Sequence, residues 1–363
     1  MNFTQIDLFD WLKTQPHGYR DLASSGVHGP ATMGELGIRL DDLPVSDVNQ
    51  YGFPPLRELL AAKFGVSVEQ VAITPGTSMA NYVLMTLMLQ SGGAVAMERP
   101  VYRPFPAIAE SISGRPPLFI EREPAQRYEL KAGAVRQLPV DPALVIVTNL
   151  HNPSGVLAPF ENIDQLADDV AARGGMLMVD EVFLPFVETM QWRTSAARHD
   201  HVVATGSLTK AFGLSGLRVG WVLGPKKVIH DVQRLMDYMH VVQATSPEVA
   251  AYRVLEAGIG DELLRKARRR AAENLPIVLS ALSDLADAEW IEPDGGVVIL
   301  VRRPSRKPTL SFCQKLYEEE NVLTQPGHYF GAPDAVRIGF AGEPVEVADH
   351  MKRFVRVWRM EIG

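Results

Sequence analysis

Short apolar runs alternate with longer helical patterns through the middle of this chain, between Val71 and Leu223. Such alternation is typical of βαβ units, in which a helix returns the chain to the same edge of a sheet after each buried strand. Seven runs have the length and character of strands: Val71–Thr74, Ala94–Met97, Leu118–Ile120, Leu144–Thr148, Met176–Asp180, Val202–Ser207 and Val219–Leu223. The sequence therefore predicts a seven-stranded, mostly parallel sheet inside a large α/β/α domain.

The pattern changes after a helix expected at Lys227–Tyr238. One long charged helix, two isolated strands and two more helices follow: Asp261–Ala286, Val297–Val301, Leu310–Glu320, Ala335–Gly339 and Val345–Arg359. We expect these elements to form a smaller α+β domain together with the N-terminal residues. The predicted division is a large domain over residues 48–240 and a small domain over 1–47 and 241–363.

Length and composition fit an enzyme with no nucleic-acid partner. The 363 residues suffice for about two domains, and 36 basic against 43 acidic side chains give a net charge of −7 without a basic block. The one cysteine, Cys313, excludes an internal disulfide framework, and we expect it to pack inside a helix. Met1–Lys13 lacks the apolar core of a signal peptide, and no stretch has transmembrane length. We therefore expect a soluble, cytoplasmic protein with no membrane partner.

Polar motifs follow three of the expected strands. His151-Asn152-Pro153-Ser154-Gly155 comes after one run, Asp180-Glu181 after the next, and Lys210 just after a third. Open α/β sheets bind their ligands at the carboxyl ends of such strands. A lysine held there among serines and glycines is partly desolvated, which favours the neutral amine that forms a Schiff base with a carbonyl.

An Asn-Pro-small-Gly turn, an aspartate, a lysine and an arginine stand in this order at Asn152, Asp180, Lys210 and Arg218. With these motifs the whole chain resembles the class I/II aminotransferases. The resemblance implies PLP-dependent transferase fold type I and pyridoxal 5′-phosphate (PLP) as cofactor. It further implies transfer of an amino group from an L-amino acid to a 2-oxo acid through a Lys210 Schiff base, with Lys210 also carrying the Cα proton.

Gly76-Thr77-Ser78 lies between a strand and a helix expected through Met79–Leu89. Backbone N–H groups at a helix N-terminus bind anions, so this segment is a candidate cradle for the cofactor phosphate. The alternative is an ordinary helix cap formed by Thr77 or Ser78. Ser207 and Arg218 resemble the other phosphate ligands of the family.

The resemblance assigns three residues to the cofactor ring. Asp180 matches the carboxylate that holds the pyridine nitrogen protonated, which makes the ring an electron sink. Asn152 resembles the donor to the 3′ oxygen of the cofactor. Tyr102 matches the aromatic that stacks on the ring, although a buried core tyrosine is an equal alternative.

Substrate and subunit contacts are also implied by the resemblance. Arg337 matches the guanidinium that binds the substrate α-carboxylate through two parallel hydrogen bonds, and Asn152 lies beside it in the family. Gly26 and Val27 resemble the segment that lines the substrate pocket. Tyr51 resembles the tyrosine that reaches the phosphate in a neighbouring subunit, which implies a homodimer; local packing is the alternative for Tyr51.

One position departs from the family pattern. Most members have a tyrosine three residues after the pyridine aspartate, and this chain has Phe183. Loss of that hydroxyl donor should raise the pKa of the Schiff base and leaves the outcome of the reaction open. A PLP-dependent lyase, cyclase or synthase acting on an L-amino acid is therefore the alternative to an aminotransferase. His199-Asp200-His201 has the residue types of a metal site but no strand or helix to fix them, so no metal is predicted.

Overall fold

The computed structural model describes residues 4–15, 18–46, 49–131, 133–285, 287–303 and 307–360. Its largest sheet has seven strands in the order β2-β8-β7-β6-β5-β3-β4, and only β8 runs antiparallel to its neighbours. The strands are β2 (Val71–Thr74), β3 (Ala94–Arg99), β4 (Leu118–Glu121), β5 (Pro142–Thr148), β6 (Met176–Asp180), β7 (Val202–Ser207) and β8 (Gly220–Leu223). The predicted seven-stranded, mostly parallel sheet is confirmed.

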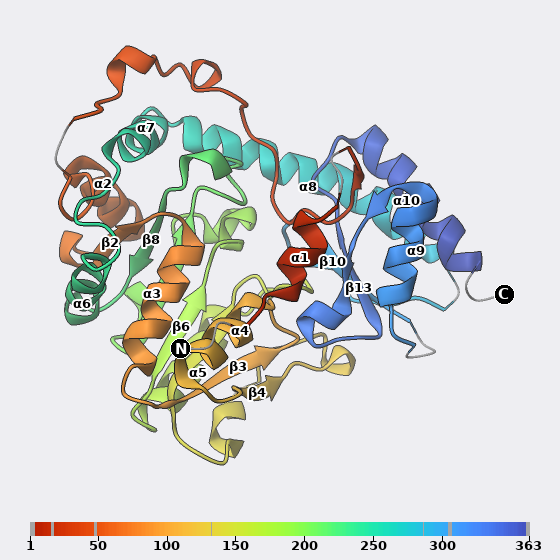
Figure 1. Ribbon diagram of the computed structural model, residues 1–363, viewed down its shortest axis with the longest axis horizontal. Coiled ribbons are helices and arrows are strands. Elements are labelled where there is room, and N and C mark those ends of the chain that lie inside the picture. Colours follow the sequence, from red (N-terminus) through yellow and green to blue (C-terminus); the bar gives the residue numbers. More distant parts are fainter. Residues whose placement is uncertain are drawn as a thin grey trace.

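Helices cover both faces of this sheet, which gives three layers (Figure 1). One face packs against α3 (Thr77–Leu89), α4 (Pro104–Ser113) and α6 (Lys226–Met236), and the other against α5 (Phe160–Ala171). Successive strand side chains point to opposite faces, so both faces need apolar residues, and every side chain of β7 is buried. The fold is the α/β fold predicted for the chain.

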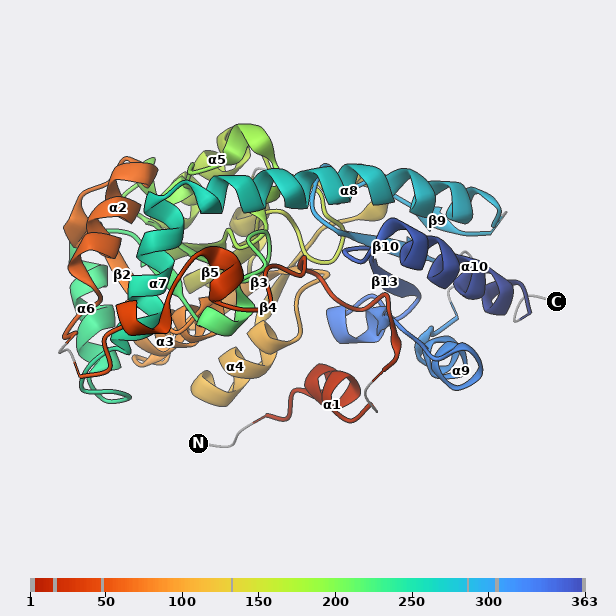
Figure 2. The ribbon, with the colours of Figure 1, turned by 90° about the horizontal axis from the view of Figure 1, so that it is seen from above.

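Two further helices connect the large sheet with the rest of the chain. Helix α7 (Thr245–Glu256), which was not predicted, packs against α2 (Pro54–Phe64). Helix α8 (Ile259–Ser283) then runs along most of the molecule, as Figure 2 shows. The predicted end of this helix at Ala286 lies outside the described residues. Within the described part of the chain, no helix combines the length and the apolar character needed to span a bilayer.

A second, antiparallel sheet has the strand order β12-β13-β10-β9. Its strands are β9 (Glu289–Trp290), β10 (Val298–Arg302), β12 (Gln325–Pro326) and β13 (Ala335–Gly339), and α9 (Leu310–Glu320) and α10 (Pro344–Met360) accompany them. Cys313 is fully buried within α9, as expected. The predicted helices and strands of this region are thus present.

The N-terminal segment joins this second unit. Strand β1 (Arg20–Asp21) pairs in parallel with β11 (Val322–Leu323), and α1 (Asp7–Lys13) is anchored by Trp11, whose indole N–H donates to the carbonyl oxygen of Thr324 over 2.9 Å. Residues 47 and 48, where the predicted domain boundary falls, lie outside the described residues. The division into two domains stays a prediction.

Candidate active site

A cavity of about 270 Å³ lies at the carboxyl ends of β5, β6 and β7. Nine of the residues predicted for the cofactor line it: Thr77, Ser78, Tyr102, Asn152, Asp180, Phe183, Ser207, Lys210 and Arg218. Parallel strands bring their carboxyl ends to one edge, which explains how motifs more than 100 residues apart in the chain meet here. The structure therefore brings together most of the predicted cofactor set.

Lys210 stands between this cavity and a second one of about 280 Å³, because it lines both. Its Nζ donates to Ser25 Oγ over 3.0 Å. Burial, followed by the positive charge of Arg337, lowers the pKa of Lys210 to about 8, while Asp180 opposes the shift. The neutral amine that acts as a nucleophile is therefore formed more readily near physiological pH than in a free lysine.

Asp180 is buried at the end of β6, and its side chain is held from two directions. Its Oδ2 accepts a hydrogen bond from Asn81 Nδ2 over 2.9 Å, and its Oδ1 accepts one from the backbone N–H of Val182 over 3.1 Å. Burial raises the pKa of Asp180 to about 6, and these two donors oppose the shift. The carboxylate stays ionised above that pH and faces the cavity.

The start of α3 and Arg218 form a corner of the cavity rich in donors. Gly76 precedes the helix with φ 85°, a conformation that favours glycine, and a Cβ there would lie 2.5 Å from Arg218 Nη2. The Thr77 hydroxyl is buried without a protein partner, and Ser207 lines the same cavity. The unpaired hydroxyl, the helix N-terminus and the guanidinium fit a phosphate dianion.

Arg337 lines the second cavity from β13 and is 1% exposed. Its Nη1 donates to Asn152 Oδ1 over 3.0 Å and its Nη2 to the carbonyl oxygen of Ala23 over 2.6 Å. The Nε atom is buried with no hydrogen-bond partner. Burial lowers the pKa of Arg337 to about 10. Among the described residues no carboxylate forms an ion pair with Arg337, although the charge of Asp21 acts on it, so the guanidinium retains donor capacity for an anionic ligand.

The segment carrying Gly26 and Val27 forms another wall of the second cavity. The backbone N–H of Val27 donates to the carbonyl oxygen of Lys210 over 3.1 Å. A Cβ at Gly26 would lie 3.0 Å from the Cα of Lys210, so the small residue permits this close approach. The two predicted pocket residues thus lie directly against the lysine.

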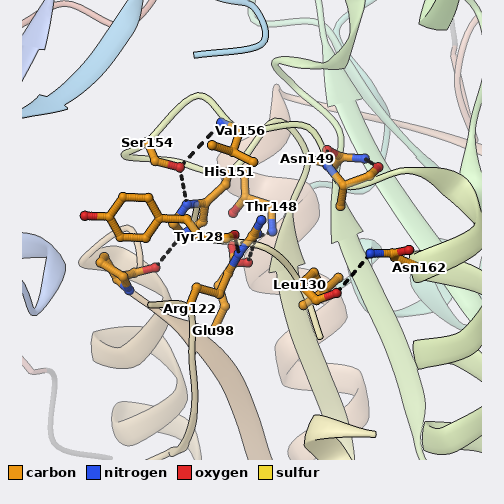
Figure 3. Close-up of polar contacts among 12 residues, drawn as sticks. Glu98, Arg122, Tyr128, Leu130, Thr148, Asn149, His151, Ser154, Val156 and Asn162 are labelled. Carbon is orange, nitrogen blue, oxygen red and sulfur yellow. Dashed lines mark hydrogen bonds and ion pairs between the residues drawn. The ribbon is translucent and has the colours of Figure 1, made fainter. Parts of the chain in front are cut away.

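His151 directly precedes Asn152, and its ring contacts Ser154 in the same turn (Figure 3). Its Nε2 lies 2.9 Å from the carbonyl oxygen of Pro100, and its Nδ1 lies 2.6 Å from Ser154 Oγ. Because a carbonyl only accepts, Nε2 carries the proton and the serine hydroxyl donates to Nδ1. Burial lowers the pKa of His151 well below its usual value, so the ring is neutral. It ties the turn of Asn152 to the segment that presents Tyr102.

A buried ion pair fixes the strands beneath this turn, as Figure 3 shows. Glu98 Oε2 accepts from Arg122 Nη1 and Glu98 Oε1 from the backbone N–H of Thr148, each over 2.7 Å. Both charged side chains are at most 2% exposed. Thr148, at the end of β5, also lines the cofactor-sized cavity, so the pair holds a cavity wall in place.

Two aromatic residues border the lysine. Tyr102 lines both cavities, and its ring makes edge contacts with Phe9 and Phe105 at centroid distances of 6.5 and 6.1 Å. The Phe183 ring centroid lies 5.9 Å from Lys210 Nζ. A tyrosine at position 183 would place its hydroxyl in this region, and phenylalanine leaves it apolar.

Tyr51 lies apart from these residues. It lines neither of the two cavities and is 39% exposed. Its predicted contact with the phosphate of a neighbouring subunit requires a second chain and stays a prediction. His199, considered as a metal ligand, pairs with Asp168 over 2.8 Å, and the described residues hold no cluster of three or more candidate ligands.

Several residues that line the first cavity were not predicted, among them Phe9, Ser25 and Asn81. Asn81 follows Thr77 by one helical turn and so lies on the same face of α3, a spacing that could have revealed it. Ser25 directly precedes the predicted Gly26. Nothing in the sequence around Phe9 indicates its position, because it depends on where α1 docks.

Comparison with known proteins identifies the family. Residues 47–354 match the model of the family described as aminotransferase class I and II. The chain belongs to this family. It is therefore an enzyme of the PLP-dependent class I and II aminotransferases, with pyridoxal 5′-phosphate as its cofactor.

Three proteins similar to this member of the class I and II aminotransferase family show how far the similarity extends. Capreomycidine synthase of Streptomyces vinaceus is 30% identical over 92% of this chain and 88% of its own length. Arginine–pyruvate transaminase AruH of Pseudomonas aeruginosa is 27% identical over 78% and 74% of the two chains. The structure of a PLP-dependent aminotransferase from Streptococcus suis superposes with a TM-score of 0.89 over 99% of both chains at 23% identity, which confirms fold type I.

Proposed function

We propose that this protein is an aminotransferase that moves an amino group from an L-amino acid to a 2-oxo acid. The observation that carries the proposal is the position of Lys210, whose amine of lowered pKa lines both cavities, between the donor-rich corner at Arg218 and the buried Arg337. When bound, pyridoxal phosphate supplies an aldehyde that condenses with amines and a ring that accepts the electron pair left by Cα deprotonation.

The first cavity would hold the cofactor. Its phosphate would be bound at Gly76-Thr77-Ser78 together with Ser207 and Arg218, and its pyridine nitrogen would face Asp180. The described geometry supports these roles, since the donors lie at one corner and the carboxylate at the end of the neighbouring β6. Tyr102 and Asn152 would contact the ring from the side shared with the second cavity.

The second cavity would hold the amino acid. Arg337 would bind the α-carboxylate with its unpaired Nε and orient the Cα–H bond toward Lys210. Once the amino acid has displaced Lys210, the free amine of Lys210 would take the proton from Cα. It would then deliver this proton to the cofactor. Gly26 and Val27 would limit the space next to the lysine.

A second candidate function is cyclisation or synthesis on the same scaffold. Two observations favour it: capreomycidine synthase, a relative with 30% identity, is not named as a transaminase, and Phe183 replaces the hydroxyl that most family members have. Arginine–pyruvate transaminase, at 27% identity, supports transamination instead. The cofactor and Lys210 serve both reactions, so the fate of the substrate decides between them.

The deciding experiment is a near-visible absorbance titration of the cofactor-loaded protein with a panel of amino acids, arginine included, without an oxo acid. Transamination predicts conversion of the cofactor to its amine form with one equivalent of 2-oxo acid. Continued product formation with an unchanged absorbance band would establish the cyclase or lyase alternative. Arg218→Ala serves as a control, since it should lower cofactor occupancy without changing which product forms.

We further propose that two copies of the chain form the active unit. Tyr51 is near the bridge between Asn49 and Gln243, and exposed apolar side chains follow α6 at Tyr238, Val241 and Val242. Exposed apolar side chains of this size next to one another are typical of a subunit interface. Sedimentation at two concentrations tests this, and a monomer with full activity would contradict it. The cytoplasmic location stays a prediction.

A further inference from the structure

Asn81 is a buried amide on α3, one helical turn after Thr77. It is 6% exposed, and the buried residues around it on the helix include Ala80, Leu84 and Met85. A buried amide that makes no hydrogen bonds destabilises the folded protein. The hydrogen-bond partners of Asn81 therefore indicate its role. The cavity lining includes Asn81 together with Thr77 and Asp180.

Both ends of the Asn81 amide are paired. Its Nδ2 donates to Asp180 Oδ2 over 2.9 Å, and its Oδ1 accepts from the hydroxyl of Thr205 over 2.8 Å. Thr205 is 1% exposed and pairs with Asp180 across β6 and β7. Because the Thr205 hydroxyl donates to the amide oxygen of Asn81, the NH₂ group of Asn81 is held toward the carboxylate of Asp180.

Asp180 therefore receives one neutral donor on each oxygen, from Asn81 and from the backbone of Val182. A carboxylate oxygen has two acceptor sites, so each oxygen retains one for a ligand in the cavity. The titratable groups that act on Asp180 are Lys210 and Tyr102 in the cavity and Glu181 next to it in the chain. No arginine or lysine forms an ion pair with Asp180 among the described residues.

We propose that Asn81 is a positioning residue that keeps the carboxylate of Asp180 ionised and directed at the cofactor ring. The proposal rests on the proposed role of Asp180 opposite the pyridine nitrogen. A neutral donor stabilises the buried charge without cancelling it, whereas a lysine or arginine in this place would neutralise it. The full negative charge then remains to hold the ring nitrogen protonated.

The test compares Asn81→Leu, which keeps the size but removes the donor, with Asn81→Asp, which places a second carboxylate beside Asp180. Loss of a hydrogen bond to a charged group corresponds to about 10- to 100-fold. Asn81→Leu should weaken pyridoxal phosphate binding by about 10-fold, measured by tryptophan fluorescence, and lower kcat by about 10- to 100-fold with little change in KM. Asn81→Asp should lower both cofactor affinity and kcat further, because its carboxylate would repel that of Asp180.

The pH profile separates positioning from a merely structural role. Loss of the donor destabilises the ionised form, so the pKa of Asp180 rises and the acid limb of activity in Asn81→Leu moves to higher pH. Thr205→Val, which frees the amide to rotate, should give a smaller change of the same sign. Asn274→Leu is the matched control: this buried asparagine bonds to the carbonyls of Phe340 and Gly342, away from the cavity, and its loss should leave cofactor affinity unchanged.

Wild-type cofactor affinity and kcat in a folded Asn81→Leu protein would overturn the proposal. Equal weakening in Asn274→Leu would also overturn it, since the effect would then come from general destabilisation. Cofactor affinity is measured without substrate, so this outcome does not depend on whether the reaction is transamination or cyclisation.

Discussion

The cofactor half of the site and the substrate half are built in different ways. The cofactor half comes from neighbouring strand ends and one helix of a single sheet, at Asp180, Ser207 and the start of α3. The substrate half joins segments from opposite ends of the chain, since Arg337 donates to the carbonyl of Ala23, 314 residues away in sequence. The first half depends on local motifs, and the second depends on how the N-terminal segment and β13 dock.

Their electrostatics differ as well. In the cofactor half Arg218 is exposed, and among the described residues its guanidinium donates only to the carbonyl oxygens of Ser215 and Pro75, whereas Arg337 in the substrate half is almost completely buried. A buried cation with an unpaired donor is destabilising until an anion arrives. Substrate binding in the second half should therefore depend strongly on one carboxylate, while cofactor binding is shared among several groups.

The largest expected effect comes from Lys210, which belongs to both halves. Lys210→Ala should lower turnover by at least about 10⁴-fold, the scale for loss of a group that acts covalently, because neither attachment nor proton transfer remains. Borohydride should fix the cofactor covalently to the wild type and not to the variant, as mass spectrometry would show. Lys226→Ala, which removes an exposed ion pair with Glu69, is the control. Normal turnover in Lys210→Ala would refute the proposed function.

Arg337 tests whether the two halves are separable. Arg337→Ala should raise KM for the amino acid by about 10- to 100-fold, the range for hydrogen bonds to a charged group, and leave cofactor affinity unchanged. Arg337→Lys keeps the charge but cannot reach Asn152, Ala23 and a carboxylate together, so it should recover little. Steady-state kinetics and cofactor titration give both values. A parallel loss of cofactor affinity would show that the halves act as one unit.

The same difference explains what the sequence could predict. The seven strands and the residues at their ends were predicted because the information is local: an apolar run followed by a polar motif. Helix α7 was missed because Pro247 indicates a turn, although proline is tolerated in the first turn of a helix. The bond between Asn81 and Asp180 spans 99 residues and leaves no local pattern. The docking of Arg337 on Ala23 is likewise a consequence of tertiary packing.

Phe183 allows a smaller test inside the cofactor half. Phe183→Tyr adds a hydroxyl that would donate to the 3′ oxygen of the cofactor and so favour its ionised form. The pKa of the near-visible band of the loaded enzyme should fall by about one unit, with turnover changed by only a few-fold. Absorbance between pH 5 and 10 measures this. Phe9→Tyr adds the same hydroxyl on another wall of the cavity and should leave the pKa of the band unchanged. An equal fall of this pKa in Phe9→Tyr would contradict a specific effect of position 183.

Glu181 provides the smallest expected effect on turnover, because it adjoins Asp180 in the chain but does not line the cavity. It accepts hydrogen bonds from the backbone N–H and the hydroxyl of Ser195, over 2.8 and 2.6 Å. Burial raises the pKa of Glu181 to about 7 from an ordinary value near 4.5. Between these two values the folded protein binds the proton on Glu181 more tightly than the unfolded chain, so the contribution of Glu181 to stability is greatest below about pH 4.5 and is lost as the pH rises through 7.

Glu181→Gln should remove this dependence while keeping both bonds to Ser195. The wild-type free energy of unfolding should fall by on the order of 3 kcal/mol more between pH 4.5 and 8 than that of the variant, since each pKa unit corresponds to about 1.4 kcal/mol. Urea denaturation at the two pH values measures the free energy of unfolding of each protein. Because Asp180 and His151 titrate in both proteins, their contributions cancel when the variant is compared with the wild type. Turnover and cofactor affinity at pH 7 should stay within about two-fold, because no charge in the cavity changes. An equal change in the free energy of unfolding of the two proteins between these pH values would mean that Glu181 titrates with its ordinary pKa. A loss of cofactor affinity in Glu181→Gln would mean that Glu181 contributes to the cofactor site.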